Sequence, residues 1–404
     1  MSRMQPFTRL MPFEDALARA MEAILPIERT EKVELDHSNG RVASEDVRSG
    51  IDVPRFDRAA MDGYAVRASD TFGATQTEPK QLRIVARLSA SDVLQRPIRE
   101  GECVQISTGS AIPPGADAVV MAEYAEERAG FANIYRPIYP WGNVSRRGSD
   151  IAKGQLVVSK GRLITPSAIG ALAAVGVRQV EVYQRPKVAV VPTGSEIVDI
   201  SSQPKEGQVF DVNTHAVSAV LAENRCIPVR LPIVPDEEEE ISKALSQALN
   251  YDMVVLSGGS SVGERDIMYK VLSSRGDVLF HGVQVKPGKP TLFALVQGKP
   301  VFSMPGHPTS CLSNAYLFLE PCIRKLARLP PKRRQVVRAR MAKRLTFTLG
   351  RKQFVTVQLR DGLVHLAFKE SSAISSMSKA DGYIVVPENV ESIEEGEEVE
   401  VTLL

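Results

Sequence analysis

Apolar residues recur at helical spacing near the beginning of the chain. One face of a helix over residues 12–25 would carry Phe13, Ala16, Leu17, Ala20, Met21 and Ile24. From about residue 33 to residue 158 the pattern changes, because short apolar runs alternate with glycine, proline and aspartate. This punctuation predicts a β-rich region with many turns.

Strand-like and helical stretches alternate between residues 186 and 329. In chain order they cover residues 187–191, 213–224, 227–234, 236–250, 253–256, 300–304 and 309–329. Strands that alternate with helices of this length predict βαβ units and a parallel sheet. Right-handed crossovers would place the carboxyl ends of the strands, and any ligand, at one edge of that sheet.

A basic stretch from Lys332 to Arg344 follows the Pro330-Pro331 pair. It is interpreted as a solvated linker rather than as a surface for polyanions. Short alternating runs at 354–359 and 383–386 then predict a small, all-β C-terminal domain.

Composition narrows the class of protein. The 404 residues suggest about three domains, and 43% apolar with 24% charged residues excludes a disordered or fibrous chain. Lys+Arg (50) and Asp+Glu (48) nearly balance, so the net charge of +2 gives no general case for binding nucleic acid or an anionic membrane. The longest apolar stretch, residues 168–177, is too short to span a bilayer, and the four cysteines form no close Cys-x-x-Cys pair. We therefore expect a soluble, cytoplasmic protein with free thiols.

The strongest local motif is the run Leu256-Ser257-Gly258-Gly259-Ser260-Ser261-Val262-Gly263-Glu264-Arg265-Asp266. Glycines after a strand let backbone N–H groups approach an anion, and the dipole of the following helix favours that charge. The spacing matches neither the dinucleotide fingerprint nor the P-loop. We interpret the run as a phosphate site, with a plain βα turn as the alternative.

Three acidic residues, Glu196, Asp236 and Asp266, each follow a predicted strand of the same sheet. Convergence at one edge would create a carboxylate site suited to Mg²⁺ shared with a phosphate. Taken singly, each acid has a structural alternative, which for Asp236 is the N-cap of the next helix.

Two lysines flank a stiff turn in Lys286-Pro287-Gly288-Lys289-Pro290. Prolines restrict the backbone and lysines act as point charges, so the loop suits an oxyanion or phosphate, with a surface turn as the alternative. In the later turn Pro305-Gly306-His307-Pro308, His307 is interpreted as a hydrogen-bonded turn residue, with an acid/base role as the alternative. Cys311 is interpreted as a packing residue.

Three further loops are polar: residues 56–67, 107–115 and 146–150. Physical arguments leave them as loops that could bind a ligand. Together with the motifs above, they make the chain resemble the molybdopterin molybdenumtransferases, the MoeA and gephyrin E-domain family, over essentially its whole length. The resemblance is carried by Met61-Asp62-Gly63-Tyr64-Ala65, Thr108-Gly109, Pro114-Gly115-Ala116-Asp117-Ala118-Val119-Val120, Arg147-Gly148-Ser149-Asp150, Thr193-Gly194-Ser195-Glu196, Ser257–Gly263, Lys286–Pro290, Pro305–Pro308 and Ser371–Met377.

The resemblance implies a multidomain α/β plus β fold that works as a homodimer. A small helical or linker domain would combine residues 1–32 with 155–185, and an irregular β-rich domain would span 33–154. Residues 186–330 would form a central parallel-sheet α/β domain that binds molybdopterin, and residues 331–404 a small C-terminal β-barrel.

The resemblance also implies a reaction. Family members take adenylylated molybdopterin and molybdate, cleave the phosphoanhydride with Mg²⁺, release AMP and leave molybdenum on the dithiolene. The implied protein partners are a second subunit and, transiently, the molybdopterin adenylyltransferase and recipient apo-molybdoenzymes. No nucleic acid or membrane is expected to bind.

The motifs described above and the resemblance together give the site residues, and the resemblance adds Asp62, Thr108, Asp150 and the molybdate contacts. Catalytic roles fall to Asp62, Thr108, Asp150, Glu196, Asp236 and Asp266, of which the last three would also hold Mg²⁺. The first three of these would complete the cleft of the opposite subunit. Substrate-binding roles fall to Gly258, Gly259, Ser260, Gly263, Pro305 and Pro308, and to the molybdate contacts Lys286, Lys289, Arg351 and Ser371.

Two positions depart from the family pattern. A lysine that often precedes the Lys-Pro-Gly-Lys motif is missing near Gly282, and His307 stands where many relatives have asparagine. Tungstate is nearly isosteric with molybdate, so a tungstate-inserting enzyme is one alternative, and a non-catalytic molybdopterin-binding or scaffold protein is another. A pyrophosphate hydrolase that uses the α/β domain alone is disfavoured by the loops at Asp62 and Thr108 and by the region of Ser371.

Overall fold

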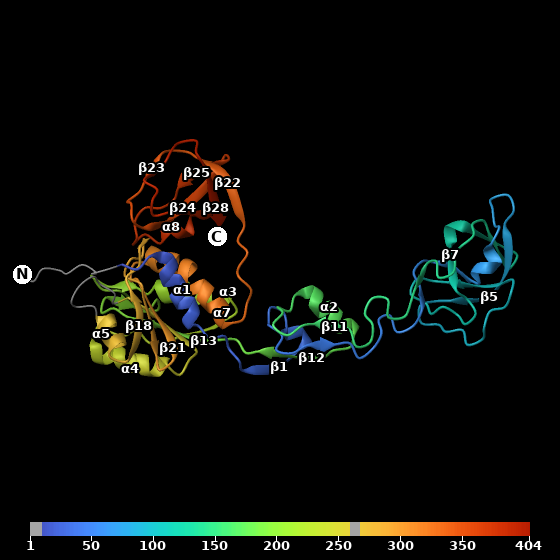
Figure 1. Cartoon of the computed structure of the whole chain (residues 1–404), viewed down its shortest axis with the longest axis horizontal. Helices are drawn as coiled ribbons and strands as arrows, with labels where there is room; N and C mark the ends of the chain where they lie inside the picture. The colour runs from blue at the N-terminus through green and yellow to red at the C-terminus, as the bar shows by residue number, and fades with distance from the viewer. Residues whose placement is uncertain (1–9, 259–266) are drawn as a thin grey trace, which may run out of the picture. The chain divides into compact units, whose positions relative to one another are not determined.

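The computed structural model describes residues 10–258 and 267–404. The chain forms two compact units (Figure 1). Unit 1 contains the residues up to Glu31 and Tyr183–Leu404, and unit 2 contains Lys32–Val182. Within the described ranges, no helix combines the length and the apolar composition of a membrane span.

Unit 1 is built around a six-stranded sheet with the order β16-β13-β17-β21-β20-β18. In that order the strands are Ile227–Arg230, Lys187–Pro192, Met253–Ser257, Lys299–Met304, Leu292–Val296 and Gly276–His281. The first four strands are parallel, whereas β20 is antiparallel to both of its neighbours. The sheet is mixed rather than purely parallel because Gln297 and Gly298, both with positive φ, close a two-residue hairpin between β20 and β21.

Helices cover both faces of this sheet. They are α1 (Phe13–Ala23), α3 (Asn213–Glu223), α4 (Glu238–Ala248), α5 (Ile267–Ser273), α6 (Pro308–Asn314) and α7 (Glu320–Leu326). Successive residues of β13 point to opposite faces, so Val188 and Val190 join the core under α1, α3 and α7, while Ala189 and Val191 join the core under α4 and α5. Burial on both faces explains why this strand is an almost continuous apolar run.

The helix predicted over residues 309–329 is interrupted. A π-helical turn, η4 (Ala315–Leu319), separates α6 from α7. Pro321 lies in the first turn of α7, and a proline there removes an N–H group and crowds the preceding turn, which the wider π turn accommodates. Phe318 in this turn is fully buried and packs against Phe13 of α1, with ring centroids 4.6 Å apart.

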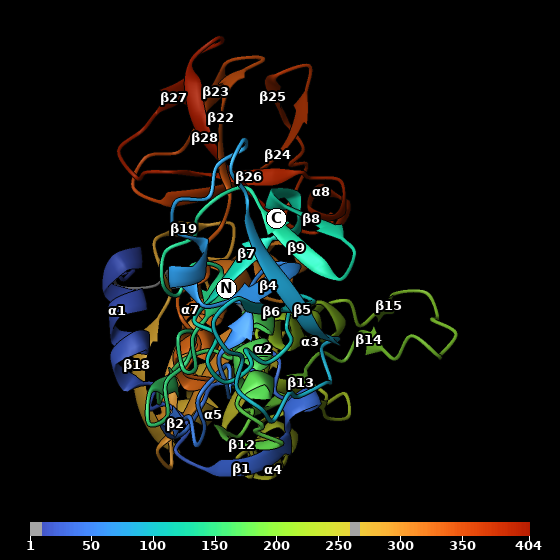
Figure 2. The same ribbon diagram turned by 90° about the vertical axis from the view of Figure 1, so that its right-hand side faces the viewer.

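The C-terminal part of unit 1 is a closed barrel, which confirms that prediction. Its strands are β24 (Lys352–Arg360), β25 (Leu363–Leu366), β22 (Val336–Met341), β28 (Glu398–Leu403) and β26 (Gly382–Val386), and β26 pairs back onto β24. Figure 2 shows the barrel strands grouped together at the top of the view, apart from the helices and strands of the α/β part. A short strand of the α/β part, β19 (Val285–Lys286), extends this sheet by pairing parallel with the start of β24.

The sequence predicted a solvated linker over the basic stretch after Pro331. The structure corrects this prediction for the beginning of the stretch, where Lys332 and Arg334 form ion pairs. Glu320, which is 3% exposed, forms ion pairs with Lys332 at 2.9 Å and with Arg334. The Arg334 guanidinium also lies over the rings of Tyr316 and Tyr383, 5.1 and 5.6 Å from their centroids. A buried carboxylate requires such partners, so this cluster ties the start of the barrel to the α/β part.

Unit 2 is rich in short strands, as predicted. Its six-stranded sheet contains β7 (Ala118–Met121), β4 (Gly63–Val66), β6 (Glu102–Ile106), β5 (Lys80–Leu88), β9 (Phe131–Ile134) and β8 (Ala125–Arg128). Shorter pairs join β2 (Val47–Arg48) to β11 (Leu156–Val158), β3 (Arg58–Ala59) to β10 (Val144–Ser145), and β1 (Thr30–Glu34) to β12 (Gln179–Tyr183). Helix α2 (Pro166–Ala174) is capped by the Thr165 side chain.

Candidate functional site

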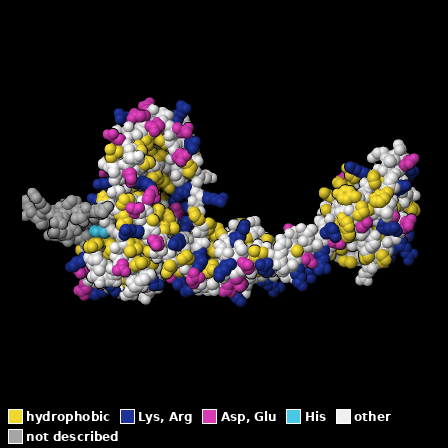
Figure 3. All heavy atoms as spheres, in the orientation of Figure 1, with side chains coloured by type: hydrophobic (Ala, Val, Ile, Leu, Met, Phe, Trp, Pro, Cys, Tyr) yellow, Lys and Arg dark blue, Asp and Glu magenta, His cyan; other side chains and the backbone are white. Residues whose placement is uncertain are grey.

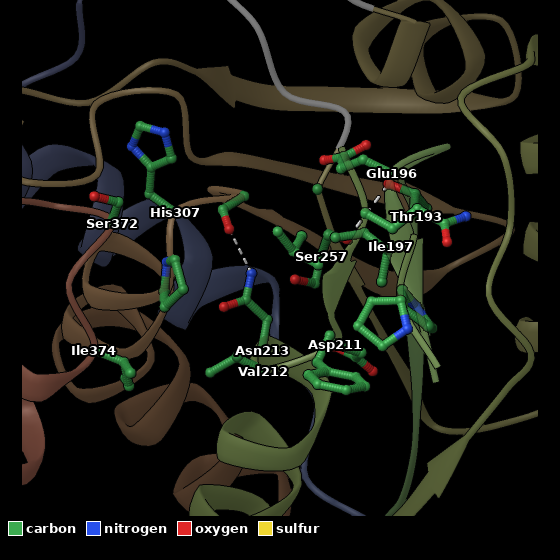
Figure 4. A pocket seen from close by; sticks show the side chains of 18 residues that line it. Thr193, Glu196, Ile197, Asp211, Val212, Asn213, Ser257, His307, Ser372 and Ile374 are labelled. Carbon is green, nitrogen blue, oxygen red and sulfur yellow. Dashed lines mark hydrogen bonds between the residues drawn. The ribbon is translucent and has the colours of Figure 1, made fainter. Parts of the chain in front are cut away.

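Two adjoining cavities lie at the carboxyl edge of the α/β sheet. The first cavity has a volume of about 650 Å³ and includes residues that follow β13, β17 and β21. Its walls include the apolar side chain of Phe210. Figure 4 shows Ile197 and Ile374 in the same walls, together with polar groups such as Thr193 and Ser257. Figure 2 shows the segment with β14 (Ile197–Val198) and β15 (Val209–Phe210), which supplies part of this wall, extending away from the sheet.

The second cavity has a volume of about 700 Å³ and is strongly cationic. Its charged side chains are Lys286, Lys289, Arg351, Lys369 and Glu370, and Pro305 and Ser371 also line it. The two cavities share Gly306 and His307 in their walls, so they adjoin at these residues. Figure 3 shows basic and acidic side chains interspersed on the visible face of the barrel and the α/β part.

Backbone contacts hold the lysine loop in place. The Val283 N–H donates to the Lys289 carbonyl at 2.9 Å. The Gly288 carbonyl accepts hydrogen bonds from the side chains of Thr291 and Asn314, both fully buried, at 2.9 Å each. Pairing of β19 with β24 then brings this loop next to Arg351, which lies 65 residues after Lys286 in the sequence.

Gly288 is the residue of this loop that tolerates no side chain. Its φ is +107°, and an added Cβ would overlap the amide of Asn314. We expect Gly288→Ala to cost about 1–3 kcal/mol of stability and to weaken oxyanion binding roughly tenfold or more, because it displaces both lysines. Thermal melts and equilibrium binding of molybdate would measure the two effects.

Gly298 provides the matched control for this variant. Its φ is +73°, but an added Cβ would meet nothing within 4 Å, and the residue lies in the β20–β21 hairpin outside both cavities. Gly298→Ala should therefore lose some stability and keep oxyanion affinity. Equal losses of affinity in the two variants would contradict the proposed role of the loop.

Positive groups in the second cavity perturb one another. Burial, and then the neighbouring Arg351 charge, lower the pKa of Lys289. Cations held this close gain from an anion placed among them. The cavity is therefore suited to a small oxyanion, with lysines as point charges and arginine as a planar donor.

Two of the three predicted carboxylates lie close together. Partial burial and the charge of Glu196 raise the pKa of Asp236, against the opposing effect of the Thr193 side chain. Oδ1 of Asp236 is buried without a hydrogen-bond partner among the described residues. Helix α4 has Glu237 as its N-cap, so Asp236 is not the capping residue.

The donor set fits a hard divalent cation. Carboxylate oxygens are the ligands that Mg²⁺ takes in proteins, and an unpartnered buried oxygen beside a second carboxylate gains from a cation. The third predicted ligand, Asp266, lies outside the described residues. Within the described ranges alone, no group of three or more His, Cys, Asp or Glu side chains could hold a metal ion.

The glycine run is described only at its beginning. Gly258 lines the first cavity with a φ of +110°, and an added Cβ would overlap the Thr193 carbonyl, so only glycine fits there. Gly259, Ser260 and Gly263 lie outside the described residues. Pro308 lines the first cavity at the beginning of α6.

The remaining predicted residues belong to unit 2. Oδ1 of Asp62 accepts hydrogen bonds from the backbone N–H and the hydroxyl of Thr108, at 2.6 and 2.8 Å. These bonds lower the pKa of Asp62, so its carboxylate is ionised. Asp150 lies in another loop, where its N–H donates to the Val53 carbonyl at 3.0 Å.

Several residues of the cavities were not singled out from the sequence, among them Asn213, Phe210 and Lys369. Nδ2 of Asn213 donates to the Gly306 carbonyl at 2.7 Å, and its Oδ1 is buried with no partner in the described part of the chain. Phe210 and Lys369 complete the walls of the first and second cavities. Of these three, only Lys369 could have been found from the sequence, because it lies two residues before the Ser371 motif.

The cysteines take no part in this site. All four are free and buried. Burial raises the pKa of the Cys311 thiol to about 12, which leaves it protonated and unreactive. The interpretation of Cys311 as a packing residue agrees with this environment.

Comparisons with known proteins cover nearly the whole chain. Residues 11–176 match the MoeA N-terminal region (domains I and II), 189–325 a probable molybdopterin binding domain, and 330–404 the MoeA C-terminal region (domain IV). The molybdopterin molybdenumtransferase of Haemophilus influenzae is 31% identical over 402 residues, which cover 97% of this chain and 98% of that protein.

Solved structures agree with this assignment. Two crystal structures of the molybdopterin biosynthesis MoeA protein from Pyrococcus horikoshii are 39% and 32% identical to this chain, with TM-scores of 0.84 and 0.85. Both cover 98% of this chain, and the chain covers 99% and 100% of them. The chain belongs to the MoeA family, the molybdopterin molybdenumtransferases of molybdenum cofactor biosynthesis.

Proposed function

We propose that this protein transfers molybdenum from molybdate to adenylylated molybdopterin and releases AMP in a Mg²⁺-dependent reaction. The observation that carries the proposal is the junction at Gly306 and His307 between a cationic cavity and a cavity with apolar walls. An anionic substrate with a planar heterocycle at one end needs both environments next to each other.

The second cavity is the proposed site of molybdate. The ion is a tetrahedral dianion, and it would meet Lys286, Lys289 and Arg351, with the Ser371 hydroxyl as a neutral donor. Lys369 adds a further positive charge at the same cavity. Tungstate has the same charge and nearly the same size, so the test below compares the two oxyanions.

The first cavity is the proposed site of the heterocycle. Phe210 offers an aromatic face, and the unpartnered Oδ1 of Asn213 offers an acceptor to a ring N–H. Gly258 lets the backbone approach a phosphate closely. Glu196 and Asp236 would hold Mg²⁺, which when bound would neutralise charge on the phosphoanhydride.

The proposal includes a homodimer. Asp62, Thr108 and Asp150 of one subunit would complete the site of its partner, as the family resemblance implies. The domain limits expected from the sequence, and transient contacts with the molybdopterin adenylyltransferase and apo-molybdoenzymes, belong to the same proposal.

The decisive experiment measures AMP release from adenylylated molybdopterin by the full chain. Molybdate, tungstate or neither is supplied, and Mg²⁺ is varied. Release of several AMP molecules per subunit that requires both an oxyanion and Mg²⁺ supports the proposal and ranks the two metals. Tight binding of the pterin without AMP release would instead indicate a binding or scaffold protein.

Alkaline pH should weaken oxyanion binding through Lys289. Because the pKa of Lys289 is lowered, the side chain loses its proton at a lower pH than an ordinary lysine, and the neutral amine no longer attracts molybdate. Affinity should fall as the pH rises through this lowered pKa. In Lys289→Arg the charge persists, so the fall should shift to higher pH. Identical alkaline profiles for both proteins would contradict this assignment.

A further inference from the structure

We propose that His307 positions the oxyanion by taking up a proton, which turns the hydroxyl of Ser371 toward the bound anion. The inference rests on the proposed function, because it assumes that the second cavity binds an oxyanion. It adds a positioning residue and predicts that anion binding is coupled to protonation.

His307 lies at the junction of the two cavities. Its Nδ1 is 2.8 Å from Oγ of Ser371, which lies 64 residues later in the barrel part. Figure 4 places the imidazole ring near Ser372, at the side of the first cavity where the barrel segment passes. The ring therefore contacts the one neutral hydroxyl proposed to bind molybdate.

The backbone around this contact is held firmly. The Ser371 carbonyl accepts a hydrogen bond from the Thr309 N–H at 3.0 Å, and the Thr309 hydroxyl donates to the Ala373 carbonyl at 2.9 Å. Thr309 is fully buried. With the backbone of Ser371 anchored, rotation of its hydroxyl about the C–O bond is the smallest movement that redirects the hydroxyl proton.

Proton counting shows why that rotation depends on His307. A serine hydroxyl has one proton to donate. If Nδ1 carries only a lone pair, the Ser371 proton satisfies it, and the oxygen turns its lone pairs to the cavity. When Nδ1 gains a proton from solvent, the ring N–H donates to Oγ instead, and the hydroxyl, with its O–H bond intact, turns to donate a hydrogen bond to an oxygen of the anion. No covalent bond to carbon changes, and one proton is taken up.

The surrounding charges favour this coupling. The charged groups that line the second cavity with His307 are Lys286, Lys289, Arg351, Lys369 and Glu370, and those of the first cavity are Glu196 and Asp211. A dianion bound among these groups places negative charge beside the imidazole ring and favours the added proton. Histidine is the ordinary side chain that exchanges a proton near neutral pH, which makes it suited to this role.

Titration calorimetry of the full chain with inorganic molybdate tests the proposal. Runs in buffers of different ionisation enthalpy, from about pH 6.5 to about pH 8, give the number of protons taken up. We expect up to one proton per anion in the wild type, and an affinity that rises by up to about tenfold for each unit of decreasing pH. Proton uptake in Lys289→Arg should remain, which separates His307 from the titration of Lys289.

His307→Asn is the decisive variant because an asparagine amide can replace the protonated Nδ1–H as a donor to Ser371 without titrating. It should bind molybdate with no proton uptake over this range, and at about pH 8 at least as tightly as the wild type does. His365→Asn, in β25 and outside both cavities, is the matched control and should behave as the wild type.

Two outcomes would overturn the inference. One is wild-type binding without proton uptake, and the other is an unchanged proton count in His307→Asn. If AMP is still released with molybdate in either case, only the proposed role of His307 is wrong, and the proposed function stands. If the wild type binds neither molybdate nor tungstate and releases no AMP, the proposed function fails with it.

Discussion

Asp236→Asn is expected to abolish Mg²⁺-dependent AMP release while leaving the protein at least as stable as the wild type. The amide keeps the size of the side chain but removes a charged ligand for the cation. Electrostatic stabilisation by a bound metal ion is worth several kcal/mol in the transition state, so we expect a loss of roughly a hundredfold or more.

The stability of this variant follows from the raised pKa of Asp236. An acid whose pKa is higher in the folded state binds its proton more readily there, so stability is greatest at low pH and decreases as the pH rises through the raised value. Asparagine carries no charge and avoids this decrease. For the same reason, protons should displace Mg²⁺ from the wild type at a higher pH than from ordinary carboxylates.

AMP release over a Mg²⁺ titration and thermal melts at several pH values would measure both effects. Glu239→Gln is the matched control, because Glu239 is exposed on α4 and pairs only with Lys243 among the described residues. Near-wild-type AMP release in Asp236→Asn at moderate Mg²⁺ would remove this residue from the proposed metal site.

Mixing two inactive variants, Asp62→Ala and Glu196→Ala, is expected to restore about a quarter of wild-type activity. Each change disables one unit of the chain, since Asp62 belongs to unit 2 and Glu196 to unit 1. If sites are shared across a symmetric dimer, each mixed dimer has one site with both residues intact. Half of the randomly assorted dimers are mixed, and each has one active site of two, which gives about a quarter.

The ionised Asp62 carboxylate, held by two hydrogen bonds from Thr108, supports a direct role for this residue. Subunits would be exchanged by co-expression, and AMP release would be measured on the purified mixture. A mixture of Glu196→Ala with Asp236→Asn is the control, because both changes lie in unit 1 and no mixed dimer regains an intact site. Absence of recovery in the first mixture would exclude a site shared between subunits.

The sequence alone predicted much of the fold and part of the site, through its apolar runs, its glycine positions and the order of its motifs. Apolar runs that alternate with helical stretches predicted the α/β sheet, because strands buried on both faces must be almost wholly apolar. Glycine at Gly258 and Gly288 was visible as a motif, because each position leaves no space for a side chain. The motif series also identified the family, which the comparisons confirmed.

Other features were not predicted from the sequence. The antiparallel β20 follows from a local signal that the sequence analysis did not use, the two-residue turn at Gln297 and Gly298. The ion-pair cluster around the buried Glu320 has no local pattern, because Glu320 meets Lys332 and Arg334 only through the packing of the barrel against the α/β part.

The site residues also fall into two groups, those found from local motifs and those placed only by tertiary contacts. Lys286 and Lys289 stand out within one short motif, but only the pairing of β19 with β24 places Arg351 beside them. Asn213 and the contact between His307 and Ser371 were likewise set by tertiary structure. Local motifs report on the backbone, which neighbouring residues control, whereas the walls of a cavity are assembled from side chains far apart in the sequence, and only the packing of the barrel against the α/β part brings them together.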